Sequence, residues 1–228
     1  MQLQAKLPSQ SIVNYKFPDA SRFGHVIAKK KIYKRATPTA KVKKLFVSQV
    51  QKITWAYKLS PATVNLPAHG GIEEIQVFTV GLKTGELSPE VLQTMDKAIP
   101  SPLLFMLTYN RKCRYVAVYK RPNDADKSSW MVSSYFGTRW MNESGEKLEL
   151  PVVLDMEALY HFLIKSFIPI PKRKDEHLDD LVQRLDQVRA KEREAGRLEI
   201  RINKETQFNR RVEQIFKLMS PGTEVKTI

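Results

Sequence analysis

The sequence predicts an α+β fold, in which a mostly antiparallel sheet of about four strands is backed by helices and followed by a long C-terminal helix or helical hairpin. Three observations lead to this prediction. Apolar residues recur at helical spacing before residue 60, four runs rich in branched and aromatic residues lie between residues 72 and 136, and charge density rises sharply beyond Pro171. We therefore expect a basic, largely irregular segment at 1–38, an α+β core domain at 39–170 and a charged helical arm at 171–228.

The first long helix is expected at residues 40–60. Thr37 or Thr39 can cap its start, and Ser60 with Pro61 ends it. The apolar residues of this stretch recur three or four positions apart and predict one buried face: Val42, Leu45, Phe46, Val50, Ile53 and Tyr57.

The strands are expected at residues 72–82, 102–109, 113–120 and 128–136. The first is apolar on both faces, so we expect it to be covered on both sides. A short helix with Pro89 at its first position follows it. The second and third strands are separated by Asn110, Arg111 and Lys112, which indicates a hairpin extended into a meander.

Two helical stretches complete the chain. Residues 154–168 are largely apolar and predict a core helix, whereas residues 175–219 are rich in charge and carry a narrow apolar stripe. We expect this stripe to bind a partner or a second copy of the chain, mainly through Leu178, Leu181, Leu185 and Val188, and the alternative is that it packs on its own domain as core. The stripe continues toward Val212, Ile215 and Met219.

The positive charge is concentrated near the amino terminus. Residues 1–58 hold thirteen lysines and arginines against the single Asp19, so they carry +12 of the net charge of +14. Such a local excess attracts polyanions, and nucleic acid is favoured over a solvated face or a membrane surface, because no stripe of large apolar residues accompanies the basic run. The residues expected to contact nucleic acid are Lys29, Lys30, Lys31, Lys34, Arg35, Lys41, Lys43 and Lys44, with Lys120 and Arg121 on the predicted hairpin.

No complete catalytic or metal-binding motif is present in the sequence. The glycine pair Gly70 and Gly71 lacks the Lys-Ser or Lys-Thr of a phosphate loop, and the four histidines are far apart. Cys113 is the only cysteine and falls in a predicted strand, so we expect neither a disulfide nor a nucleophile. We expect no cofactor and no metal, and, because neither a signal peptide nor a membrane span is evident, a cytoplasmic location.

A metal-dependent nuclease is an alternative that the sequence supports weakly. Such sites need two carboxylates with a nearby lysine. Glu73, Glu74 and Gln76 lie on a predicted strand but lack that lysine, and Asp124, Asp126 and Lys127 fall in a predicted loop.

Several motifs, in this order, resemble an uncharacterised bacterial and archaeal family of unknown function. They are FVSQVQKITWAYKLSPATVNLP, EEIQVFTVGL, AIPSPLLFML, YVAVYKRP, SSWMVSSYF with Trp140, and KETQFNRRVE, and they span roughly residues 28–219. Members of that family occur beside helicases and DNA methyltransferases in type III-like restriction or defence loci. The resemblance implies that setting and carries over no catalytic residue.

Together these observations favour a non-enzymatic accessory subunit of a restriction or defence assembly. We expect it to bind DNA with low sequence specificity and to dock a helicase or DNA methyltransferase through its C-terminal helices. The alternatives are an effector nuclease of such a system and a pure protein-interaction adaptor.

Overall fold

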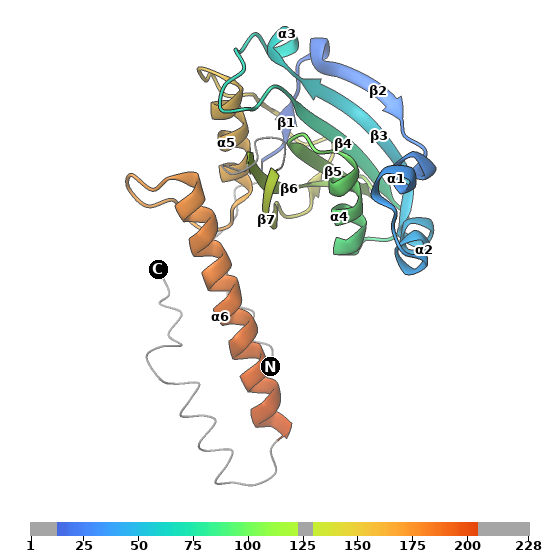
Figure 1. Cartoon of the computed structure of the whole chain (residues 1–228), viewed down its shortest axis with the longest axis vertical. Coiled ribbons are helices and arrows are strands. Elements are labelled where there is room, and N and C mark those ends of the chain that lie inside the picture. The colour runs from blue at the N-terminus through green and yellow to red at the C-terminus, as the bar shows by residue number, and fades with distance from the viewer. Residues whose placement is uncertain (1–12, 123–129, 205–228) are drawn as a thin grey trace. The chain divides into compact units, whose positions relative to one another are not determined.

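The structure is a computed structural model that describes residues 13–122 and 130–204 (Figure 1). The chain divides into two compact units, the first ending at Pro171 and the second beginning at Lys172. The first unit is α+β, as predicted. No helix in the described ranges has an apolar stretch long enough to cross a membrane.

A mixed sheet forms the centre of the first unit. Its main strands lie in the order in which they occur in the chain: β2 (Arg22–Val26), β3 (Val50–Leu59), β4 (Ile75–Leu82), β5 (Leu103–Tyr109), β6 (Lys112–Pro122) and β7 (Trp130–Gly137). The short β8 (Met141–Asn142) also pairs with β6. All neighbours are antiparallel except β4 and β5. The sheet is therefore mostly antiparallel, as predicted, but it has more strands than the four expected.

The parallel pair is connected by a helix that crosses one face of the sheet. Parallel neighbours require such a crossover, and α4 (Pro89–Ala98) provides it, with Ser88 at the N-cap and Pro89 in the first turn. The Ser88 hydroxyl accepts from the Gln49 amide at 2.8 Å. This bond ties the start of α4 to the end of α2 (Ala40–Gln49).

Helices cover both faces of the sheet. On one face, α1 (Lys29–Ala36), α2 and α4 enclose an apolar cluster that includes Phe78 and Val116 (Figure 1). On the other face, α5 (Met156–Phe167) packs on β6, where Tyr115 stacks on Phe167 with ring centroids 5.6 Å apart. Successive residues of a strand point to opposite faces, so Tyr115 and Val116 belong to different layers.

The helix expected at residues 40–60 is only half correct. Thr39 caps α2 by accepting from the Val42 amide at 3.4 Å, but the helix ends at Gln49 and β3 begins at Val50. The register of β3 against β4 shifts between Val50 and Lys52, as at a bulge. An inserted residue places Val50 and Ile53, three positions apart, in the same core cluster, and this spacing imitates one face of a helix.

The segment at 1–38 was expected to be largely irregular, and this expectation is wrong for residues 22–36. β2 pairs with β3, and α1 packs beside α4, burying Ile32 and Ala36 four residues apart. Both elements belong to the sheet unit. The remaining short elements of this unit are β1 (Tyr15–Lys16), a 3-10 turn at Asp19–Ser21, α3 (Pro61–Val64) and β9 (Leu148–Glu149), which pairs with β1.

The second unit contains α6 (Leu178–Lys204), a long C-terminal helix of 27 residues, as predicted. Before it, Glu176 accepts from Arg184 through two bonds of 2.7 and 2.9 Å and from the Arg173 amide at 2.9 Å. These contacts fix the chain where it enters the helix. Val212, Ile215 and Met219 lie outside the described residues.

Candidate functional site

The basic residues predicted to contact nucleic acid are carried mainly by two adjacent helices, α1 and α2. The rings of Tyr33 in α1 and Phe46 in α2 lie 5.3 Å apart, and the Lys43 ammonium lies 5.9 Å from the Tyr33 ring. Seven basic side chains are exposed here and form what we call the α1–α2 basic face: Lys30, Lys31, Lys34, Arg35, Lys41, Lys43 and Lys44. No carboxylate occurs between Val26 and Lys58, so the segment that forms this face contributes only positive charge.

Lys29 has a different place from its neighbours. Its ammonium donates to the carbonyl oxygens of Phe46 at 2.8 Å and Val50 at 2.6 Å, at the carboxyl end of α2. Burial, and to a lesser degree the nearby Lys83, lower the pKa of Lys29. A cation at this end of a helix complements its dipole, so Lys29 stabilises the fold.

Lys120 was expected to bind nucleic acid, and its burial contradicts this expectation. Only 2 % of its side chain is exposed, and its ammonium lies 2.8 Å from the Asp96 carboxylate. It also donates to the carbonyl oxygens of Ile99 at 2.9 Å and Ser101 at 3.2 Å. A phosphate has no access to it. The neighbouring Arg121 is half-buried in β6.

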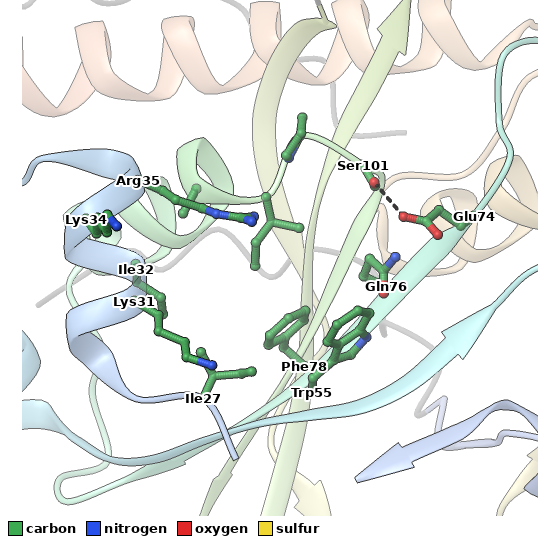
Figure 2. Close-up of a pocket in the computed structure, with 13 residues that line it drawn as sticks. Ile27, Lys31, Ile32, Lys34, Arg35, Trp55, Glu74, Gln76, Phe78 and Ser101 are labelled. Atoms are coloured by element: carbon green, nitrogen blue, oxygen red, sulfur yellow. Dashed lines mark hydrogen bonds between the residues drawn. The ribbon is translucent and has the colours of Figure 1, made fainter. Parts of the chain in front are cut away.

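A pocket of about 620 Å³ opens beside the basic face. Figure 2 shows α1 on one side, with the side chain of Arg35 extending from the helix into the pocket, and the sheet residues Trp55, Gln76 and Phe78 on the other. The connection from α4 to β5 completes it. The lining residues are Ile27, Lys31, Ile32, Lys34, Arg35, Trp55, Glu74, Gln76, Phe78, Ala98, Ile99, Pro100 and Ser101.

An aromatic row crosses the sheet and ends in this pocket. Trp55 on β3 stacks on Phe78 of β4, with centroids 5.9 Å apart and rings 8° from parallel. On its other side Trp55 meets Phe23 of β2 at 4.0 Å. Cross-strand pairing explains the row, since Trp55 lies opposite both His25 and Phe78 in the register.

The polar side of the pocket is organised around Glu74, which immediately precedes β4. Its carboxylate lies 2.6 Å from the Lys58 ammonium and accepts from Ser101 at 3.0 Å and from the Gln76 side chain. Burial opposes ionisation of Glu74, but these bonds and the charge of Lys58 outweigh it and hold the pKa of the carboxyl below its usual value. Glu74 is therefore ionised, and its carboxylate is already bonded to Lys58, Ser101 and Gln76.

Two residues that line the pocket each have a buried polar atom without a hydrogen-bond partner among the residues that the structure describes. These atoms are the side-chain oxygen of Gln76 and the indole nitrogen of Trp55. Gln76 is only 3 % exposed. Its amide nitrogen faces Glu74, because a carboxylate accepts hydrogen bonds and does not donate them, and its oxygen is left as an acceptor.

A second cluster of polar side chains lies elsewhere in the first unit. His69 Nδ1 lies 2.6 Å from a Glu157 oxygen and 3.9 Å from an Asp155 oxygen, and the three groups offer ligand atoms within 4.8 Å of one another. The sequence does not reveal this cluster, because His69 and the two carboxylates are far apart in the chain. Of the residues considered for a nuclease, Glu73 is exposed and Glu74 is paired with Lys58, whereas Asp124, Asp126 and Lys127 lie outside the described residues.

The residues predicted to bind a partner occupy the first half of α6. Leu178, Leu181 and Leu185 are buried, whereas Val188 is partly exposed. Partner binding through these residues stays a prediction.

Cys113 is buried in β6, where a strand position was expected. Burial raises the pKa of its thiol, so the thiolate is disfavoured.

Residues 16–219 match the family described as "Domain of unknown function (DUF4391)". No curated protein and no solved structure matches the chain.

Proposed function

The chain belongs to the DUF4391 family, whose function is unknown, and we propose that it is a non-catalytic accessory subunit that binds nucleic acid through the α1–α2 basic face. One observation carries the proposal. Seven lysines and arginines are exposed on two adjacent helices, and no carboxylate lies in the segment that forms them.

Electrostatics explain why such a face suits a polyphosphate. Each phosphate neutralised by a lysine or arginine releases condensed counterions, so the affinity depends steeply on salt. Contacts of this kind position a protein on nucleic acid without reading its sequence. We therefore expect low sequence specificity.

The biological setting is the less direct part of the proposal. The motifs resemble those of proteins encoded beside helicases and DNA methyltransferases in restriction or defence loci, and we propose that one of these enzymes is the partner. Docking would use the C-terminal helix. Since Leu178, Leu181 and Leu185 are buried within the chain, the exposed positions of α6 and the partly exposed Val188 are the accessible ones.

Binding as a function of salt tests the proposal. Replacing Lys31, Lys34 and Arg35 with glutamine should lower affinity for any DNA and reduce the slope of log K against log salt by about 2 to 3. The matched control replaces the exposed Lys172, Arg173 and Lys174 with glutamine, which removes the same charge from the second unit. Equal losses in both variants would show that net charge, and not this face, governs binding.

One observation favours the nuclease alternative, namely the cluster of His69, Asp155 and Glu157. Imidazole and carboxylate groups are common metal ligands in hydrolytic sites. If DNA is cleaved in the presence of magnesium or manganese and the cleavage is lost in Glu157→Gln, the protein is an enzyme and the accessory role is wrong.

A further inference from the structure

We propose that the pocket beside α1 binds a single unpaired nucleotide, with its base against Trp55 and Phe78 and its phosphate on the basic residues of α1. This inference rests on the proposed function and adds the class of ligand and the residues that select it. It predicts a preference for single-stranded or locally unpaired nucleic acid, which a purely electrostatic surface would not show.

The size and lining of the pocket fit a nucleotide. A volume of about 620 Å³ lies within the range of about 300 to 1,000 Å³ that is typical of small-molecule sites. Trp55 and Phe78 supply aromatic surface, and bases contact such surfaces favourably whatever their sequence. The exposed edge of the row, Phe23, is 40 % exposed and gives a neighbouring base a second aromatic surface.

The unpartnered oxygen of Gln76 points to a ligand that carries a hydrogen-bond donor. This oxygen can only accept, whereas the Trp55 indole N–H lies in the ring plane and is not used by a base that stacks on the ring. Buried polar groups in folded proteins are normally hydrogen-bonded, and leaving them unpaired is costly. A nucleobase edge offers donors and acceptors side by side, whereas an aliphatic ligand offers neither.

The positive charges in the lining indicate that the phosphate binds on the α1 side of the pocket. Lys31, Lys34 and Arg35 all line the pocket, and Arg35 extends into it in Figure 2. The one carboxylate in the lining, Glu74, is paired with Lys58, so it does not cancel the charge of α1. A ligand that carries a phosphate next to a planar polar ring therefore complements the pocket at both ends.

The test compares four ligands that differ in one property at a time. They are a 12-nucleotide single strand, the same strand with abasic sites throughout, its duplex, and a free mononucleotide. The abasic strand keeps the backbone charge and removes the bases. We expect the normal strand to bind at least about tenfold more tightly than the abasic strand and more tightly than the duplex at equal salt.

Two variants assign this difference to the pocket. In Gln76→Met and Trp55→Leu, binding of the normal strand should fall to the level of the abasic strand, while the salt slope stays that of the wild type. Trp140→Leu is the control, because Trp140 packs near Arg114 and does not line the pocket. Melting curves identify any variant that fails to fold, and the wild-type comparison of normal and abasic strands remains decisive in that case.

Each outcome decides the inference. Equal binding of the normal and abasic strands by the wild type overturns the nucleotide pocket and leaves the electrostatic proposal intact. Saturable binding of the mononucleotide that is lost in Gln76→Met, without binding of any strand, supports the pocket with free nucleotide as its ligand and overturns the proposed function. Binding of none of the four ligands overturns both.

Discussion

The ammonium of Lys120 lies 2.8 Å from the carboxylate of Asp96 in the interior of the sheet unit. Burial raises the pKa of Asp96 and lowers the pKa of Lys120, because it disfavours the charged form of each group. The opposite charge of the partner counteracts this effect in both cases. The same ammonium donates to the carbonyl oxygen of Ser101, whose hydroxyl donates to Glu74. The buried pair thus fixes the connection that forms one wall of the candidate pocket.

Removing Lys120 should destabilise the protein strongly. Lys120→Met leaves the buried Asp96 carboxylate without its counter-charge and several carbonyl oxygens without their donor, and we expect a loss of about 3 to 5 kcal/mol in the free energy of unfolding. Denaturant titration measures it. The control is Lys97→Met on the exposed side of α4, which should change stability by less than about 0.5 kcal/mol. A loss in Lys120→Met no larger than the control would mean that the pair contributes little.

The Glu176 carboxylate should make the second unit sensitive to acid. Hydrogen bonds from Arg184 lower its pKa to about 2, well below the usual 4.5. A depressed carboxyl pKa contributes stability above the unfolded value, and this contribution is lost as the pH falls from about 4.5 toward about 2. Glu176→Gln should therefore cost about 1 to 2 kcal/mol at pH 6, allowing for solvent screening, and almost nothing near pH 2.

The comparison of wild type and Glu176→Gln at both pH values cancels the titration of other carboxyl groups. Gln183→Ala, at an exposed position in α6, is the control; it changes no titratable group and should have the same effect at both pH values. If Glu176→Gln lowers the free energy of unfolding by the same amount at both pH values, the lowered pKa of Glu176 is contradicted.

Gly70 should tolerate alanine worse than Gly24 does. Both have positive φ, +59° and +72°, so each alanine meets a conformational cost of about 1 to 2 kcal/mol. At Gly24 a Cβ meets open space, whereas at Gly70 it would overlap the Glu157 carboxylate that bonds His69. Thermal unfolding of Gly70→Ala should show a loss larger than that of Gly24→Ala by about 1 kcal/mol. Equal losses would show that Glu157 moves aside freely.

The hairpin between β5 and β6 offers a stabilising substitution. Its two connecting residues, Asn110 and Arg111, have φ of 47° and 60°, the conformation of a type I′ turn, in which glycine is preferred at the second position. Arg111→Gly should raise the free energy of unfolding by about 0.5 to 1 kcal/mol. Arg111→Ala removes the same side chain but keeps a Cβ in the left-handed conformation, so it should not raise the free energy of unfolding. An equal rise in both variants would show that loss of the Arg111 charge, and not relief of backbone strain, stabilises the protein.

The sequence predicts the elements whose signals are local. α4 and α5 carry their start signals beside a clear apolar face, and the β5–β6 hairpin is marked by its turn residues. The boundary at Gln49 was missed because the bulge in β3 produces the three-residue spacing of a helix. β2 has no apolar alternation, since all its residues are exposed at the edge of the sheet, so composition alone did not reveal it.

The candidate site was only partly predictable for a related reason. Exposed lysines on α1 and α2 follow from the charge pattern, but the sequence does not show that Lys29 and Lys120 turn inward to carbonyl groups. Trp55 was expected on a helix, and its place beside Phe78 in the pocket depends on strand pairing between residues that are 23 positions apart. Long-range pairing of this kind is decided by packing, which a single sequence does not display.

The strand order β2-β3-β4-β5-β6-β7 has a consequence for how the protein is made. On the ribosome the chain emerges from its amino end, and each strand after the first finds its neighbour already synthesised. The sheet can thus grow by one strand at a time, and the longest connection to close between neighbouring main strands is residues 27–49, between β2 and β3. The exception is β1, because Tyr15 pairs with Leu148 and must wait until most of the sheet unit has left the ribosome.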